Sequence, residues 1–348
     1  MTLIMVDACE RAGGLGWSGN YEAALASAGA ARTGAKGTRL YVGFGARKEY
    51  TIPVAANQHA TMTVGFAYKQ TVSTSPTPNT LLVVRTGGTD TMSIQAYSPT
   101  GNTAINLRLV RTKDNVVLWD SGTPLVDGST WYYIELKVTV HPTAGSVELR
   151  TNEVTRVVLT GIDTTSSNAA DTLITGFIWY AVGNADGYSN VLDDFYLNNG
   201  AGSVNNSFNG DTTVHALRPN AAGLPTQFTP TGVAANWDNV NETDLNTQDY
   251  NEANVVTFTD LYSIDNLPAA AAGKQVFGVQ IHGVLASVSL PRSGALVIGS
   301  AALNTEPAVI ALTTQPTEYR YILETKPGGG TWSTADVDAA QIGVRVKS

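Results

Sequence analysis

The chain has few of the residues that mark several common protein classes. It contains one cysteine, Cys9, in 348 residues, so no disulfide bond can form within the chain. This argues against a small disulfide-stabilised secreted scaffold. Only 14% of the residues are charged, against about 25% in a typical soluble protein. The net charge is -8, and the lysines and arginines are scattered singly. A nucleic-acid binder needs a basic stripe, so we expect no nucleic-acid partner.

Long apolar runs are also missing. No run approaches the roughly 18 residues that a membrane helix needs, so we expect no membrane insertion. The N-terminal MTLIMVDACERAGG has no basic segment, and its short apolar run is too short for a signal peptide. The sequence therefore predicts synthesis and initial retention in the cytoplasm.

Motifs for phosphate or metal binding are incomplete. GAARTGAKGT at 29–38 has glycines and a lysine, but Lys36 does not follow Gly34 directly. Gly273 and Lys274 are adjacent, but Pro268 stands where the first glycine of a phosphate-binding loop is required. The four histidines are far apart, and no second cysteine supports a zinc site. We therefore predict no cofactor and no metal.

Jelly rolls host glycosidases, which use a pair of carboxyl groups. The distance between the two carboxyl groups is about 5 Å or more. Asp193 and Asp194 are adjacent, so on a strand they point to opposite faces. Asp336 and Asp338 share a face if their segment is extended, but WSTADVDAAQ fits a polar turn equally well. We therefore predict no catalytic residues and no enzymatic activity.

What the sequence does contain is a series of short strand patterns separated by turn signals such as TGGTD, SPTGN and GNADG. Many short strands with regular turns are typical of an all-β sandwich or jelly roll. One segment, YEAALASAGA at 21–30, is the only candidate helix. The expected strands of the first part are 38–44, 49–54, 61–69, 80–86, 91–98, 104–111, 116–122, 172–182 and 191–199.

The clearest pattern is WYYIELKVTVHPTAGSVELRTNEVTRVVL at 131–159. Apolar and polar residues alternate on both sides of the turn-like HPTAG, which predicts a hairpin with one buried and one solvent-facing side. The residues expected in the core are Ile134, Leu136, Val138, Val147 and Leu149.

The pattern weakens after Asn198 and resumes near Val255. We predict a first domain at 1–218, an irregular acidic connector at 219–254 and a small β-sandwich domain at 255–348. TTVHALRP at 212–219 fits one more strand. Residues 238–249, DNVNETDLNTQD, are rich in oxygen donors for calcium but lack the spacing of an EF-hand loop. We therefore interpret this segment as a solvated acidic linker, with calcium binding as the alternative.

Aromatic side chains offer stacking platforms for a glycan, although tryptophans inside apolar runs belong by default in a core. Trp237 lies in the irregular connector and is the candidate for an exposed ring that contacts a glycan or a partner. Packing against a neighbouring domain is the alternative for it. The six tryptophans are Trp17, Trp119, Trp131, Trp179, Trp237 and Trp332.

The order of these segments resembles the laminin-G-like, concanavalin-type jelly rolls of bacteriophage virion proteins. The resemblance rests on VDACERAGG, on WYYIELKVTV followed by GSVELRTNEV, and on VLDDFYLNNGAGSVNNSFNGDTTVHALRPNAAGLPTQFTP. In the later part it rests on DLYSIDNLP, KQVFGVQIHGV and WSTADVDAAQIGVRVK. It implies an N-terminal jelly-roll sandwich followed by a smaller β-sandwich domain. It departs from calcium- and glycan-binding relatives because it lacks an obvious ligand cluster.

The resemblance implies a structural component of a phage particle, such as a tail, neck or capsid-attached fibre, adhesin or decoration protein. Its expected location is the virion, assembled in the host cytoplasm. Its expected partners are other virion proteins, a host-surface glycan and further copies of itself, in a homotrimer. The alternatives kept open are a carbohydrate-binding module or lectin and, less favoured, a glycan depolymerase.

Overall fold

The computed structural model consists mainly of strands, with 49% strand and 5% helix, which confirms the expected all-β sandwich class. It describes residues 3–10, 17–19, 24–27, 30–41, 46–70, 76–101, 104–128, 130–182, 188–242, 246–289, 291–299 and 304–348. The chain divides into two compact units, Met1–Val214 and His215–Ser348. No helix in these ranges has the length and apolar character needed to span a bilayer.

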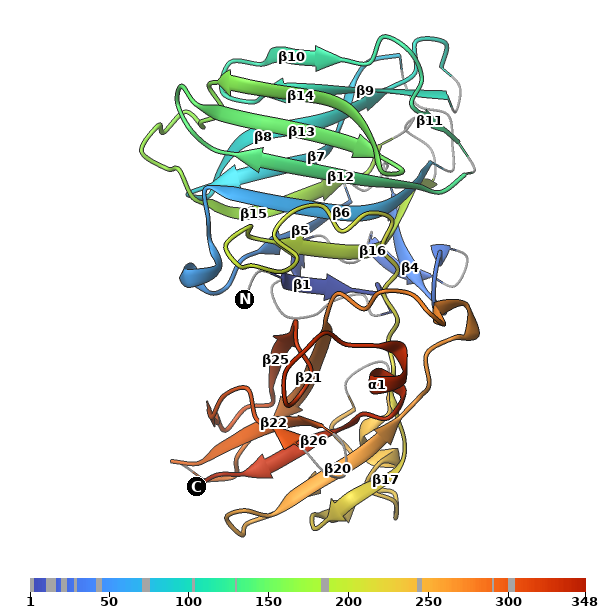
Figure 1. Ribbon diagram of the computed structural model, residues 1–348, viewed down its shortest axis with the longest axis vertical. Coiled ribbons are helices and arrows are strands. Elements are labelled where there is room, and N and C mark those ends of the chain that lie inside the picture. The colour runs from blue at the N-terminus through green and yellow to red at the C-terminus, as the bar shows by residue number, and fades with distance from the viewer. Residues whose placement is uncertain are drawn as a thin grey trace. The chain divides into compact units, whose positions relative to one another are not determined.

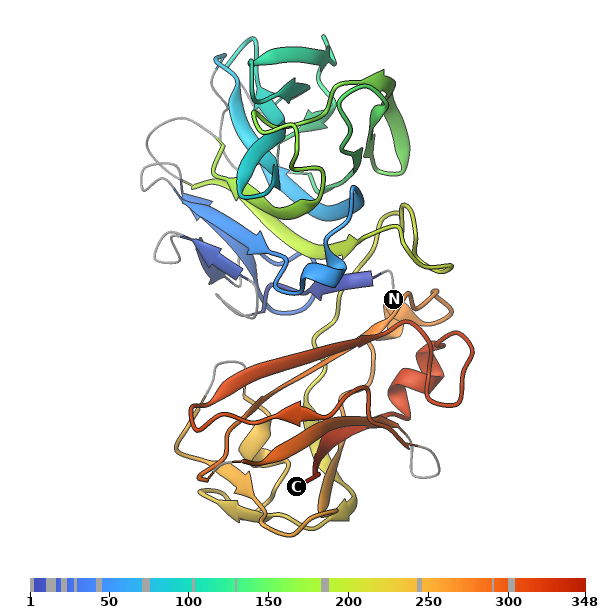
Figure 2. The ribbon, with the colours of Figure 1, turned by 90° about the vertical axis from the view of Figure 1, so that its left-hand side faces the viewer.

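The first unit is a sandwich of two antiparallel sheets (Figures 1 and 2). The sheet that we call the β12 sheet has the order β14 (Val154–Ile162), β13 (Gly145–Thr151), β12 (Tyr132–Thr139), β6 (Thr61–Gln70), β16 (Tyr188–Asn198), β4 (Gly37–Tyr41) and β3 (Ala24–Ser27), with β1 (Leu3–Asp7) paired to β16. The sheet that we call the β8 sheet has the order β10 (Val116–Asp120), β9 (Ala104–Arg111), β8 (Thr89–Tyr97), β7 (Asn79–Thr86), β15 (Ile174–Tyr180), β5 (Arg47–Thr51) and β2 (Trp17–Gly19), with β11 (Val126–Asp127) paired to β9.

The predicted hairpin forms as expected. Strands β12 and β13 pair with Leu136 opposite Leu149 and Val138 opposite Val147. The five predicted core residues are buried between the sheets, together with Phe66 of β6. Successive side chains of a strand point to opposite faces, so the alternation in the sequence determines which face of each strand enters the core.

Three local expectations were wrong. The candidate helix at 21–30 contains strand β3, paired with β4 from Ala24 opposite Leu40 to Ser27 opposite Gly37. The segment 212–219 is not a strand of its own, because a strand begins only at Pro219. The segment around Asp336 and Asp338 is neither extended nor a simple turn: it forms α1 (Thr334–Asp338), with a capping box between Ser333 and Asp336. Local propensity was overridden by pairing in β3 and by a side-chain cap in α1.

A segment after β16 covers the outer face of the β12 sheet, and we call residues 199–214 the strap. Its Gly210 donates its N–H to Glu135 Oε1 at 2.9 Å, and Phe208 lies under the Arg150 guanidinium, 3.8 Å from ring centroid to Cζ. Glu135 is fully buried beneath it, so the face expected to be solvent-exposed is largely occupied by the chain itself. Burial raises the pKa of the Glu135 carboxyl.

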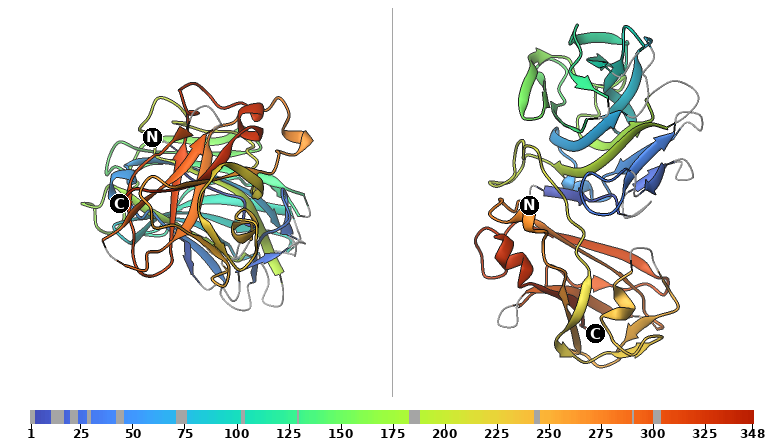
Figure 3. Two further views of the ribbon diagram at one scale, coloured as in Figure 1. Left: turned by 90° about the horizontal axis from the view of Figure 1, so that it is seen from below. Right: turned by 90° about the vertical axis from the view of Figure 1, so that its right-hand side faces the viewer.

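The second unit has two layers (Figures 2 and 3). One is a sheet in the order β17 (Pro219–Thr226), β20 (Thr259–Ile264), β26 (Gln341–Val346), β22 (Ser293–Gly299) and β23 (Asn304–Thr305), with β24 (Ile310–Ala311) paired to β22. The other is the pair β21 (Val279–Leu285) and β25 (Thr317–Leu323). Ile281, Leu296, Ile298 and Trp332 form the core between the layers.

Residues 219–254 differ from the expected irregular connector. They include β17, the pair β18 (Thr229–Thr231) and β19 (Tyr250–Glu252), and a 3-10 turn, η5 (Asp238–Val240). Buried Asp260 of β20 fastens this segment, because its carboxylate accepts the backbone N–H of Phe228 at 2.8 Å and the Asn236 amide. The strands within residues 219–254 were not predicted because proline, asparagine and glycine interrupt the apolar periodicity of this segment.

Candidate functional site

The outer face of the β8 sheet carries a hollow of about 330 Å³. In β8, Met92, Ile94 and Ala96 enter the core, so Ser93 and Gln95 between them face outwards. Ser93 is buried at the floor and Gln95 is partly exposed. The lining residues come from β7, β8, β9, the turn after β9, and β15 with the residue that follows it: Asn79, Thr80, Val83, Asp90, Ser93, Gln95, Val110, Thr112, Asn115, Tyr180 and Ala181.

Charged and amide groups on this face are ordered by one another. The Arg85 guanidinium contacts Glu49 Oε1 at 2.8 Å and Asp90 Oδ1 at 3.2 Å. Arg108 donates from Nε to Gln95 Oε1 at 2.8 Å. The bond occupies the carbonyl oxygen of Gln95 and orients its NH2 group, which has no partner among the described residues. Planar side chains fixed in this way are preorganised donors and acceptors.

Tyr180 and Thr112 also line the hollow. Partial burial and the nearby Asp90 raise the pKa of the Tyr180 phenol, so it is protonated at neutral pH although Arg47 and Arg85 act in the opposite direction. The hydroxyl oxygen of Thr112 is buried and has no hydrogen-bond partner in the described structure. Because this oxygen is closed to solvent, it offers no contact to a ligand in the hollow.

This arrangement suits a ligand that carries many hydroxyls. The Gln95 amide, the Asp90 carboxylate and the Tyr180 phenol line the hollow around buried Ser93, which is the general form of a small-molecule site. Among the described residues no group of three or more histidine, cysteine, aspartate or glutamate side chains is placed to hold a metal ion.

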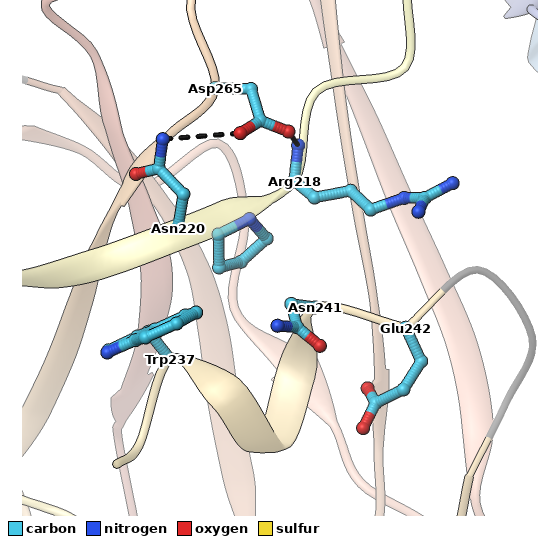
Figure 4. A pocket seen from close by; sticks show the side chains of 7 residues that line it. Arg218, Asn220, Trp237, Asn241, Glu242 and Asp265 are labelled. Atoms are coloured by element: carbon cyan, nitrogen blue, oxygen red, sulfur yellow. Dashed lines mark hydrogen bonds between the residues drawn. The ribbon is translucent and has the colours of Figure 1, made fainter. Parts of the chain in front are cut away.

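Trp237 lies elsewhere, in the second unit. It is half-buried and lines an open hollow of about 720 Å³ with Arg218, Pro219, Asn220, Asn241, Glu242 and Asp265 (Figure 4). The side chain is therefore partly accessible within its own unit. Of the described residues in 238–249, the segment with oxygen donors for calcium, Asn241 and Glu242 line this hollow.

Two other tryptophans belong to cores. Trp179 makes an edge-to-face contact with Phe195, 5.0 Å between centroids, in the first unit. Trp332 donates from its indole N–H to Leu323 O at 3.1 Å in the second unit. Trp119 and Trp131 are partly buried. The side chain of Trp17 lies outside the described structure.

Asp193 and Asp194 do not point to opposite faces, which corrects the expectation from strand geometry. A bulge in β16 interrupts the register after Asp193, and Asp194 has a φ of 51°. Both carboxylates therefore bind the segment at Arg32 and Thr33: Asp193 accepts the Arg32 backbone N–H at 2.7 Å, and Asp194 accepts the Arg32 guanidinium at 3.2 Å. The pair fixes this segment to the β12 sheet.

No motif in the sequence marks the hollow of the first unit. Its residues come from segments separated by as much as about a hundred positions, and no motif joins them. A signal was present in β8, where Thr91, Ser93, Gln95 and Tyr97 alternate with apolar residues, but the same alternation occurs in any strand with one solvent-facing side. Only the pairing of β8 with β7 and β9 brings the other residues beside them.

No protein-family model matches the chain, and no curated protein matches it. Among solved structures it is similar to the alginate lyase Aly36B in complex with alginate tetrasaccharide, with 11% identity, 53% of this chain and 85% of that chain covered, and a TM-score of 0.40. It is similar to the CBM2 module of the evolved Dit protein of Lactobacillus casei BL23 phage J-1, with 12% identity, 57% and 95% covered, and a TM-score of 0.38. It is also similar to the cellulose-induced protein Cip1, with 14% identity, 55% and 89% covered, and a TM-score of 0.36.

This comparison corrects the expectation that the chain is not an enzyme. Several of the similar structures are alginate lyases, including one from Klebsiella pneumoniae. A fold alone does not decide between glycan cleavage and glycan binding.

Proposed function

We propose that the chain binds carbohydrate through the hollow on the outer face of the β8 sheet, as a component of a bacteriophage particle. The observation that carries the binding proposal is the hollow itself, in which Gln95, Tyr180 and Asp90 lie around buried Ser93. Each sugar hydroxyl is both a donor and an acceptor, so it needs such a mixed set.

The two outer faces of the first unit differ in a way that supports this assignment. The strap covers the outer face of the β12 sheet. Polar side chains of that face, such as Glu135 and Lys137, make hydrogen bonds with the strap. On the β8 sheet, polar groups instead surround a hollow large enough for about one or two sugar rings. A polar group placed beside a hollow is a stronger sign of a ligand than one paired with the protein's own backbone.

The virion role rests on the resemblance of the segment order to phage jelly rolls and on the low share of charged residues, which suits contacts between subunits. We propose further virion proteins and a host-surface glycan as partners. Imaging of purified virions with mass spectrometry tests this part, because the chain must be recovered from particles in a fixed copy number.

A glycan array with the full-length protein tests carbohydrate binding. Gln95→Ala and Tyr180→Phe are expected to lower affinity for the bound glycan, since each removes a hydrogen-bonding group of the hollow. Lys137→Ala, on the opposite sheet, is the matched control. Binding that is equal in all three variants contradicts the assignment, and incubation of the bound polysaccharide with the protein tests for cleavage in the same experiment.

A further inference from the structure

The hollow around Trp237 in the second unit is built from three segments (Figure 4). Arg218, Pro219 and Asn220 lie at the start of β17, Trp237, Asn241 and Glu242 lie on either side of η5, and Asp265 follows β20. All of these residues belong to the same unit.

The aromatic ring is held on a fixed support. Its neighbours Asn236 and Asn239 are buried, and each is bound to other segments. Asn239 accepts the Val233 N–H at 3.0 Å and donates to Asn251 Oδ1 at 3.0 Å, while Asn251 donates to Asn236 O at 2.7 Å. Trp237 itself stays half-buried. A rigid and partly exposed indole binds a flat apolar surface at little entropic cost.

The polar groups around the ring are oriented and still have acceptor capacity. Asp265 accepts the Asn220 amide at 3.2 Å and the Arg218 backbone N–H at 3.3 Å. The side chain of Asn241 donates to Asp238 Oδ1 at 2.9 Å. In both asparagines the NH2 group is bound, and the carbonyl oxygen has no partner among the described residues.

Arg218 supplies the donor. Its guanidinium makes no hydrogen bond or ion pair with any described residue, and in Figure 4 it extends along the opening on the same side as Glu242. Burial, with Asp249 and Asp238 nearby, raises the pKa of the Glu242 carboxyl. Because Asp238, Glu242 and Asp265 outnumber the one arginine, an anionic ligand would meet unfavourable charge here.

We propose that this hollow is a second carbohydrate site, which takes a neutral saccharide ring. The apolar C–H face of such a ring stacks on Trp237. Its hydroxyls accept from Arg218 and donate to Glu242 and to the carbonyl oxygens of Asn220 and Asn241. The inference extends the proposed function to the second unit, but it uses none of the residues of the first hollow, so either site can fail without the other.

The test uses an array of neutral oligosaccharides with the full-length protein, followed by calorimetry with the strongest neutral hit. Trp237→Ala is expected to weaken this binding about tenfold, the scale of a lost aromatic contact with the accompanying desolvation. Arg218→Ala is expected to weaken it by a smaller factor, and Trp237→Phe to retain most of it. Lys274→Ala, an exposed change outside the hollow, is the matched control.

Gln95→Ala and Tyr180→Phe separate the two sites, because they must leave the neutral hit unchanged. The proposal is overturned if no neutral oligosaccharide binds at millimolar concentration, if Trp237→Ala and Arg218→Ala both bind as the wild type does, or if only acidic glycans or peptides depend on Trp237. Equal melting temperatures of the variants show that a loss of binding is local and not a loss of folding. If Trp237→Ala does not fold, Trp237→Phe and Arg218→Ala test the site in its place.

Discussion

Burial and a neighbouring carboxylate act in the same direction on Asp193. Loss of hydration, followed by the charge of Asp194, raises the pKa of the Asp193 carboxyl to about 7, although three backbone N–H groups oppose the shift. The folded protein therefore keeps this proton at pH values at which the unfolded chain, with the ordinary carboxyl pKa of 3.8, has released it. The free energy of unfolding from this group is highest below pH 3.8 and falls as the pH rises through about 7.

This sign gives a pH-dependent prediction. Asp193→Asn removes the titrating group. The free energy of unfolding of the wild type, relative to that of the variant, is therefore expected to fall between about pH 4 and pH 7. Urea denaturation at several pH values measures it. A difference that stays constant over this range contradicts the shift, and Asp114→Asn on the surface serves as a control for general charge effects.

The hairpin offers a second comparison between single residues. Leu136→Ala removes a fully buried side chain and is expected to cost about 2–5 kcal/mol. Lys137→Ala is expected to stay within about 0.5 kcal/mol, because the Lys137 side chain is partly exposed and its hydrogen bond to Ser207 is long, at 3.3 Å. Chemical denaturation checks both, and equal effects would contradict the register.

Among the elements, the strap has the clearest structural role, since it converts a solvent-facing sheet into a covered one. Gly210 is its critical turn: its φ is +75°, and a Cβ there would lie 2.5 Å from Glu153 Oε1. Gly210→Ala is expected to cost about 1–2 kcal/mol from the left-handed backbone alone. The same change is expected to make the strap more sensitive to limited proteolysis. Gly122→Ala is the control, because Gly122 also has a positive φ but a Cβ there meets no atom within 4 Å. It therefore separates the cost of the left-handed backbone from that of the clash with Glu153. Equal cleavage of both variants would contradict the role given to Gly210.

At the scale of the whole molecule, the edges of the first unit bear on assembly. The terminal strands β10 and β14 carry exposed valines, including Val117 and Val158, and β14 contains one charged residue, Arg156. Unprotected edges favour pairing with or cover by another chain. We expect a homotrimer, in line with the phage proteins that the sequence resembles. Light scattering measures it, and a monomeric mass at micromolar concentration would contradict a self-standing trimer.

Much of this protein could be predicted from the sequence by itself. The period-two alternation determined the strands and the inward side of the 131–159 hairpin, because side chains of a strand alternate between a core and the opposite face. Tertiary structure alone decided that Glu135 is buried under the strap, that Asp193 and Asp194 bind one segment, and that residues 219–254 form strands of the second unit. Tertiary structure also formed both hollows. Strand pairing and hydrogen bonds between distant segments bring Gln95 to the same hollow as Tyr180, and Trp237 to the same hollow as Asp265. Sequence periodicity records the direction of a side chain but not its neighbour across the sheet, and the chemistry of a site depends on that neighbour.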